Sequence, residues 1–203
     1  RSAPKREGRA LAYVIPVKDQ IARPTLYIVR RGLKEAIEQK ADLVVLDMDT
    51  PGGDAGTTVE IMEALEKFPG EIITFVNTEA GSAGAIIAMV TDEIYFAPTG
   101  VMGAAELILG TGADAPEALK RKMTSYIAAK AEALSASPTP RRGEVLKAMM
   151  NADFELKIGD TVISPKGELL TLSAARAVAV YGEPPEPLLA AGIANDLPAL
   201  LER

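Results

Sequence analysis

Two glycine-rich segments could carry a nucleophilic reaction. The first, GSAG at residues 81–84, lies between an apolar run and a small-residue apolar helix, so its Ser82 would stand at a helix N-terminus. The second, TPGG at residues 50–53, follows another apolar run, and its glycines let backbone amides approach a ligand and stabilise an oxyanion. Each segment also has an ordinary structural explanation, because a serine in this position is commonly a helix N-cap and Pro-Gly-Gly is a common turn.

A serine nucleophile needs a base, and the composition leaves few candidates. The chain has no histidine and no cysteine, which excludes a Ser-His-Asp triad, a thiolate nucleophile and zinc bound by either residue. On a helix predicted over residues 116–134, Lys130 falls near the middle of the apolar stripe, whereas Lys120 and Lys122 fall toward its edges. Because burial favours the uncharged amine, we predict a lowered pKa for Lys130 and a role as general base. The alternative is that Lys130 pairs with a carboxylate at a domain edge or a subunit interface.

The acidic residues at the strand ends are not assigned a catalytic role. Asp47, Asp49 and Asp92 stand where carboxylates usually cap helices or bind loop amides. Their spacing matches no calcium loop, and there is no histidine to support a transition metal. We expect no metal and no cofactor.

The elements that must position these residues alternate between two types. Short apolar runs rich in β-branched residues predict strands, and amphipathic or small-residue segments between them predict helices. This alternation predicts an α/β domain with a largely parallel sheet and flanking helices. The predicted strands are residues 11–17, 43–49, 72–76 and 93–96, with a later strand running into a turn at 162–167; the predicted helices include 26–37, 57–65, 116–134, 144–150 and 173–181.

Size and charge narrow the class of protein. The chain has 203 residues, of which 48% are apolar, enough for one sizeable core. Its net charge of -6 gives no electrostatic reason to bind nucleic acid or an anionic lipid surface. There is no signal peptide and no apolar run of the roughly eighteen residues that a membrane-spanning helix needs, so we expect a soluble portion, processed or excised, that begins at Arg1. We predict a single domain over residues 1–203, with residues 1–10 as a flexible N-terminal segment.

The ordered features TPGG, GSAG and a helical Lys130 resemble the Clp-protease and crotonase superfamily. The runs GSAGAIIAMVTDEIYFAPTGVMGAA, at residues 81–105, and ISPKGELLTLSAARAVAVYG, at residues 163–182, resemble the peptidase domain of NfeD-type membrane-bound serine proteases, the stomatin operon partner proteins. The resemblance implies a Clp-protease/crotonase-like fold and an ATP-independent serine endopeptidase. In this reaction Ser82 would attack the peptide carbonyl and Lys130 would be its base. The amides of Gly53 and Ala83 would form the oxyanion hole, and Gly52 would bind substrate.

The resemblance also implies a substrate, a partner and a location. The substrate would be an apolar peptide segment of a stomatin-like membrane protein, cleaved by a homodimer on the extracytoplasmic, periplasmic side of a membrane that anchors the full-length protein. Two other functions stay open. A crotonase-like acyl-CoA enzyme would share the fold and a backbone oxyanion hole but would transfer protons through carboxylates. A non-catalytic domain would only present a groove to a membrane partner.

Overall fold

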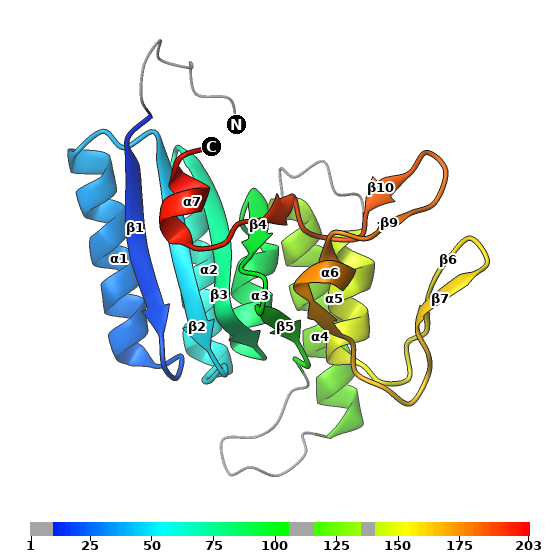
Figure 1. Ribbon diagram of the computed structural model, residues 1–203. Helices are drawn as coiled ribbons and strands as arrows, with labels where there is room; N and C mark the ends of the chain where they lie inside the picture. Colours follow the sequence, from blue (N-terminus) through cyan, green and yellow to red (C-terminus); the bar gives the residue numbers. More distant parts are fainter. Residues whose placement is uncertain (1–9, 106–115, 135–140) are drawn as a thin grey trace.

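A parallel sheet carries both glycine-rich segments. The computed structural model describes residues 10–105, 116–134 and 141–203 (Figure 1). The main strands pair in parallel in the order β1-β2-β3-β4-β11. Their register pairs Thr50 with Ala80, which places the TPGG and GSAG segments together at the carboxyl edge of the sheet. The strand bounds are β1 Ala12–Lys18, β2 Leu43–Thr50, β3 Glu71–Gly81, β4 Glu93–Phe96 and β11 Gly192–Ile193.

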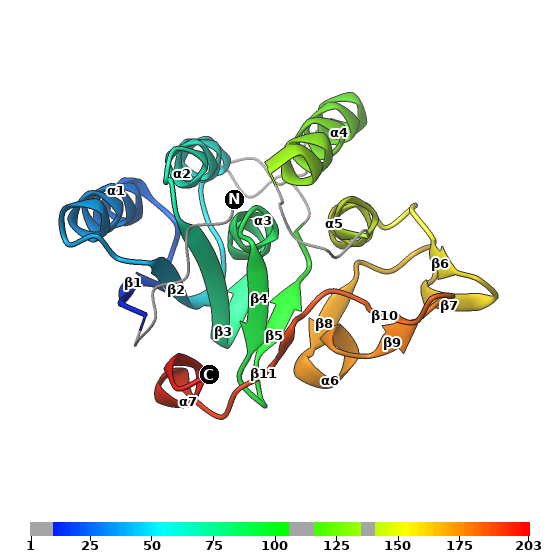
Figure 2. The same ribbon diagram turned by 90° about the horizontal axis from the view of Figure 1, so that it is seen from above.

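Helices cover both faces of the sheet (Figure 2). Helices α1 (Arg23–Glu38), α2 (Ala55–Glu66) and α3 (Ala83–Met89) lie on one face, and α7 (Leu197–Leu201) lies on the other. Two further helices, α4 (Glu117–Leu134) and α5 (Arg142–Met150), stand beside α3. All residues of α3 are buried, so the helix that follows Ser82 is held inside the domain.

Smaller elements complete the described part of the chain. Strand β5 (Val101–Gly103) continues the sheet beside the end of β3, and β8 (Thr171–Ser173) pairs with β5 in the antiparallel sense. Two hairpins project from this region: β6 (Leu156–Ile158) with β7 (Thr161–Ser164), and β9 (Val180–Tyr181) with β10 (Glu186–Pro187). None of the described helices has the length and hydropathy that crossing a bilayer requires.

The core lies between the sheet and its helices, as a parallel sheet requires. Val44, Val45 and Leu46 are consecutive in β2 and are each no more than 1% exposed, so both faces of the strand are covered. The predicted α/β fold with a largely parallel sheet and flanking helices is confirmed. The flexible N-terminal segment falls almost wholly on residues 1–9, which lie outside the described residues, and the single domain over residues 1–203 stays a prediction.

One helix is much shorter than its sequence pattern indicates. The pattern predicts a helix over residues 173–181, but α6 spans only Ala174–Ala177. The carbonyl of Ala177 accepts hydrogen bonds from the amides of Leu189 and Ala190, and the chain then pairs as the β9–β10 hairpin. Pairing with residues distant in sequence therefore overrides the local helical preference.

Candidate active site

Ser82 stands at a sharp turn between β3, which ends at Gly81, and α3, which begins at Ala83. Its backbone angles are φ 47° and ψ -114°, in a region that residues with side chains rarely occupy. Ser82 occupies the N-cap position of α3, but its hydroxyl makes no capping hydrogen bond, so side-chain capping does not account for the serine. A strained serine on a strand-to-helix turn, with its hydroxyl free of the backbone, is the geometry that presents a nucleophile.

Strand β5 and helix α3 hold the Ser82 backbone in this conformation. Its amide donates to the carbonyl of Gly103 in β5 over 3.1 Å, and its own carbonyl accepts from the Ile86 amide in α3 over 3.3 Å. The side chain is half-buried. The turn is therefore fixed on both sides, which a strained conformation needs in order to persist.

Arg142 fixes the far end of α3. Its side chain is 2% exposed and donates to the carbonyls of Met89, Thr91 and Asp92, where α3 ends, with Met89 at 3.0 Å and Asp92 at 2.9 Å. Burial lowers the pKa of Arg142 to about 10, so the guanidinium stays charged at neutral pH. A cation at a helix C-terminus complements the helix dipole. Sequence reasoning misses this residue, because an arginine at a helix start shows no sign of burial in its pattern.

The TPGG turn packs directly against Ser82. Gly52 has φ 110°, and a Cβ added there would lie 2.5 Å from the Ser82 Cβ and 3.0 Å from the Ala83 amide nitrogen. The Gly52 carbonyl accepts from the Ile21 amide over 2.8 Å, and the Gly52 amide donates to the Thr50 hydroxyl over 3.1 Å. Only glycine allows so close an approach, so the structure brings Gly52 and Ser82 together.

The two residues whose amides are predicted to form an oxyanion hole flank this contact, since Gly53 follows Gly52 and Ala83 follows Ser82. Ala83 is the first residue of α3, so its amide has no acceptor within the helix. A Cβ at Gly53 would lie 2.1 Å from the carbonyl oxygen of Ile21, which shows how tightly the turn is held. Among the described residues, neither the Gly53 amide nor the Ala83 amide donates a hydrogen bond.

Lys130 does not lie beside Ser82. Its Nζ is 3.1 Å from Oε2 of Glu66, the last residue of α2, and its side chain is 25% exposed. The hydrogen bond that Lys130 donates to Glu66 raises the pKa of Lys130, so the prediction of a lowered pKa is wrong. The apolar stripe predicts that the Lys130 side chain is buried against the core. Its amine instead contacts the carboxylate of Glu66 in helix α2. The alternative of a carboxylate partner is the one found.

Helix α2 shows how far apart the two residues are. It begins beside the TPGG turn, which packs on Ser82, and rises about 16 Å from Ala55 to Glu66, where Lys130 binds (Figure 1). A proton transfer needs hydrogen-bond reach or one bridging water. The structure therefore brings Ser82 together with Gly52, Gly53 and Ala83 but not with Lys130. In α4, Lys122 is exposed two turns nearer the strand carboxyl edge, and the Lys120 side chain lies outside the described residues.

The aspartates have structural partners. Asp47 forms an ion pair with Lys18 at 2.8 Å and accepts from the Asn77 amide group at 2.9 Å. Asp92 accepts from the backbone amide of Ile72 in β3 at 2.7 Å, so its partner is a strand amide and not the expected helix cap or loop amide. These contacts account for both carboxylates without a part in proton transfer.

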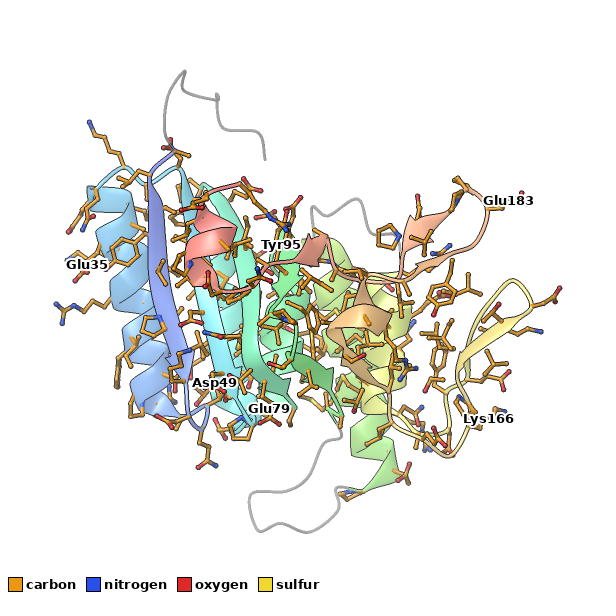
Figure 3. The ribbon with its side chains drawn as sticks, in the orientation of Figure 1. Glu35, Asp49, Glu79, Tyr95, Lys166 and Glu183 are labelled. Carbon is orange, nitrogen blue, oxygen red and sulfur yellow. The ribbon has the colours of Figure 1, made fainter. Side chains whose placement is uncertain are left out.

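Two further acidic residues lie at the sheet edge that carries Ser82. Asp49 and Glu79 are both at this end of the domain (Figure 3). The Asp49 backbone carbonyl accepts from the Asp19 amide at 3.1 Å, which joins the β1 and β2 ends. Within the described ranges, no three histidine, cysteine or acidic residues group in a way that could hold a metal ion.

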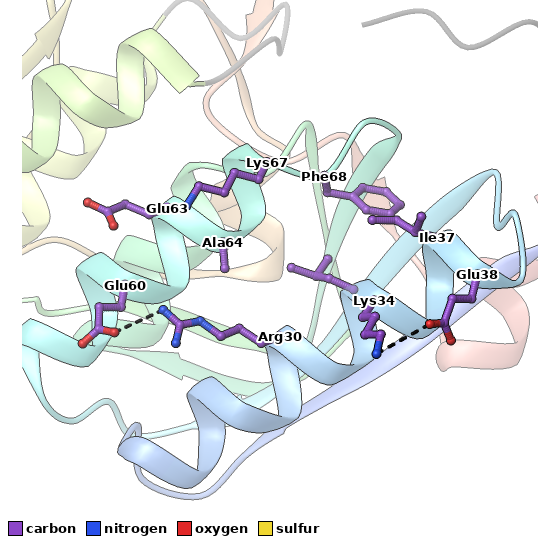
Figure 4. Close-up of a pocket in the computed structure, with 10 residues that line it drawn as sticks. Arg30, Lys34, Ile37, Glu38, Glu60, Glu63, Ala64, Lys67 and Phe68 are labelled. Carbon is purple, nitrogen blue, oxygen red and sulfur yellow. Dashed lines mark hydrogen bonds and ion pairs between the residues drawn. The ribbon is translucent and has the colours of Figure 1, made fainter.

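A groove of about 420 Å³ lies between α1 and α2, away from the predicted site (Figure 4). Its lining includes the apolar residues Leu33, Ile37, Ala64 and Phe68. Charged side chains, among them Arg30, Lys34 and Glu60, line it as well. None of the predicted site residues lines it.

Comparisons with known proteins identify the family. A family model described as NfeD1b, N-terminal domain, matches residues 11–201. Membrane protein NfeD1b of Bacillus subtilis (strain 168) is 34% identical over 192 residues, covering 94% of this chain and 40% of that protein. Membrane-bound protease PH1510 of Pyrococcus horikoshii is 28% identical over 157 residues, covering 73% of this chain and 34% of that protein. The chain thus spans two fifths or less of the length of these relatives, which are membrane proteins.

Solved structures share the fold. A lysine-to-alanine variant of the 1510-N membrane-bound stomatin-specific protease, in complex with a substrate peptide, superposes with a TM-score of 0.74 at 23% identity, covering 96% of this chain and 80% of that one. A serine-to-alanine variant of the same protease also gives a TM-score of 0.74, at 22% identity, covering 96% and 84%. The family-model match over residues 11–201 and the 34% identity to NfeD1b show that the chain belongs to the NfeD1b family and corresponds to its N-terminal domain.

Proposed function

We propose that this domain is a serine endopeptidase with Ser82 as its nucleophile. The observation that carries the proposal is the strained Ser82 turn, whose hydroxyl caps nothing and which packs so closely on Gly52 that a Cβ added there would lie 2.5 Å from the Ser82 Cβ. The relatives named as proteases support the same reaction class. The absence of histidine from the sequence requires a different base, and lysine is the available amine.

The reaction follows from the groups at the turn. The Ser82 Oγ attacks the peptide carbonyl carbon while a lysine amine takes the hydroxyl proton. The carbonyl oxygen becomes an oxyanion, which the Gly53 and Ala83 amides stabilise, while Gly52 supports the bound peptide backbone. The lysine then gives its proton to the leaving amine, and an acyl-enzyme forms. Water, activated by the same amine, releases the acyl group and restores Ser82.

The base is better assigned to Lys122 than to Lys130. Lys130 forms an ion pair with Glu66 at the C-terminal end of α2, the end remote from Ser82, and this pairing favours the charged amine. In the 1510-N protease, the serine and lysine replaced by alanine are residues 97 and 138 of that protein, 41 positions apart. In this chain Lys122 follows Ser82 by 40 positions, whereas Lys130 follows it by 48. A bound peptide would cover the exposed Lys122 amine and exclude water from around it.

The relatives support a proposal for the substrate, partner and setting. We propose an apolar peptide segment of a stomatin-like membrane protein as substrate, because the related 1510-N protease is named as stomatin-specific. Cleavage would need no ATP. A homodimer on the extracytoplasmic side of a membrane is part of the same proposal.

One observation favours a second function. In this structure the Lys130 amine pairs with a carboxylate instead of Ser82, which suits a non-catalytic domain that docks a membrane partner. Such a domain would leave Ser82 unreactive. The two functions therefore differ in a single chemical property, the nucleophilicity of one hydroxyl.

Covalent labelling by a fluorophosphonate, with cleavage of apolar peptides, tests the proposal. The native domain should be labelled at Ser82 and should cleave, Ser82→Ala should do neither, and Lys122→Met should lose both activities. Lys120→Met is the matched control on the same helix and should stay active. An unlabelled native domain would favour the docking function, and binding of a CoA thioester would instead favour an acyl-CoA enzyme. Full activity of Lys122→Met would remove that lysine from the mechanism.

A further inference from the structure

The C-terminal part of α4 is held on two opposite sides. Lys130 binds Glu66 of α2 at 3.1 Å. Two positions later, Glu132 lies against α5, where a Cβ added at Gly143 would be 1.8 Å from its Oε1. Positions 130 and 132 are separated by about 200° around a helix, so these two contacts lie on opposite sides of α4. They set both its place and its rotation.

The N-terminal part of α4 has a different character. Glu117, Ala118, Arg121 and Lys122 are exposed, whereas Ile127 and Ala128 are buried. The exposed turns project toward the strand carboxyl edge (Figure 1). Lys122 precedes Lys130 by eight residues, which is about 12 Å along a helix. A small rotation at the held end therefore moves Lys122 relative to Ser82.

The Glu66–Lys130 pair is not an ordinary surface pair. It joins residues 64 positions apart in the sequence, and its side chains are 25% and 40% exposed, Lys130 being the more buried. The Lys34–Glu38 pair, in contrast, lies within one helix turn of α1 with side chains 77% and 61% exposed. An exposed pair of this local kind contributes little, but a pair between two helices constrains their relative position.

We propose that Glu66 and Lys130 are positioning residues, which orient α4 so that Lys122 can serve Ser82. This inference rests on the proposed function, since it concerns the geometry of the same site. It also gives a role to the charged residue that interrupts the apolar stripe of α4. The pair acts through the helix and does not touch the substrate.

The kinetic test removes and then restores the pair. Glu66→Gln and Lys130→Met should each lower the rate of Ser82 labelling by about tenfold, because each should move Lys122 by only about half an ångström, and a full 1 Å at a reacting group costs about 100-fold. For peptide cleavage, kcat should fall while KM stays within about twofold. The charge-swapped variant, Glu66→Lys with Lys130→Glu, should recover most of the loss. Glu38→Gln, which breaks the exposed α1 pair, should label at the native rate.

Each contrary result has a meaning. Native labelling rates in both single variants, or no recovery in the swapped variant, would overturn the positioning role. Loss of labelling in Lys130→Met, with Glu66→Gln unaffected, would also overturn it and would make Lys130 the base. An unlabelled native domain would instead be a failure of the proposed function.

A distance measurement decides the inference without relying on activity. The chain has no cysteine, so spin labels can be attached at Tyr27→Cys on α1 and Arg121→Cys on α4. The native pair should give one narrow distance distribution. Adding Glu66→Gln should broaden or shift it, whereas adding Glu38→Gln should not. An unchanged distribution with Glu66→Gln would show that the ion pair does not position α4.

Discussion

Gly52→Ala tests the contact on which the proposed site depends. A Cβ at this position would lie 2.5 Å from the Ser82 Cβ and 3.0 Å from the Ala83 amide nitrogen. Carbon atoms in contact are normally about 3.5–4 Å apart, so the turn and Ser82 must separate by about 1 Å. A displacement of this size at a reacting group lowers a rate by about 100-fold. The φ of 110° adds strain of about 1–3 kcal/mol, because side chains rarely tolerate it.

The rate of fluorophosphonate labelling, measured with urea unfolding, separates the two effects. Gly167→Ala is the matched control, because Gly167 has φ 95° but nothing lies within 4 Å of an added Cβ. Both variants should lose stability through backbone strain. Only Gly52→Ala should lose about 100-fold in labelling rate. Similar labelling rates in the two variants would refute the claim that the approach of Gly52 to Ser82 sets the site.

Three further outcomes follow from the contacts. Arg142→Met, which removes the hydrogen bonds at the end of α3, should lower the free energy of unfolding by about 2–4 kcal/mol in urea titrations, and an unchanged midpoint would show that the buried charge contributes nothing. Thr50→Val, which removes the hydroxyl that accepts from Gly52 and donates to Asp19, should cost about 1–3 kcal/mol and slow labelling, and native behaviour would dismiss that hydroxyl as a support of the turn. Hydrogen bonds from Thr57 lower the pKa of Asp54, so the stabilisation is present above the ordinary carboxyl pKa and is lost as pH falls through the lowered one. Unfolding measured against pH should therefore show native and Asp54→Asn domains converging in acid, and a gap independent of pH would contradict this.

Much of the fold could be predicted because its signals are local. The apolar runs at 43–49 and 72–76 became β2 and β3, since a strand buried on both faces needs a continuous apolar sequence. The pattern at 26–37 became α1, whose apolar positions meet the sheet. The helix predicted over residues 173–181 formed only in part, because the amides of Leu189 and Ala190 donate to the Ala177 carbonyl. No local sequence pattern indicates such a partner.

The candidate site divides along the same line. Ser82 and Gly52 could be found from sequence, because small residues at the ends of adjacent parallel strands must meet at one edge of the sheet. The strain at Ser82 and its lack of a capping role are visible only in the structure.

The sequence by itself determined that an α/β domain without histidine or cysteine presents a serine between glycines at the carboxyl edge of its sheet. Only the tertiary structure decided the partners of Lys130 and Arg142. Lys130 pairs with Glu66 and remains a cation, and Arg142 donates to the carbonyls at the buried C-terminal end of α3. Helical periodicity gives the side of a helix on which a charge lies, but the group that the charge meets depends on how separate helices pack.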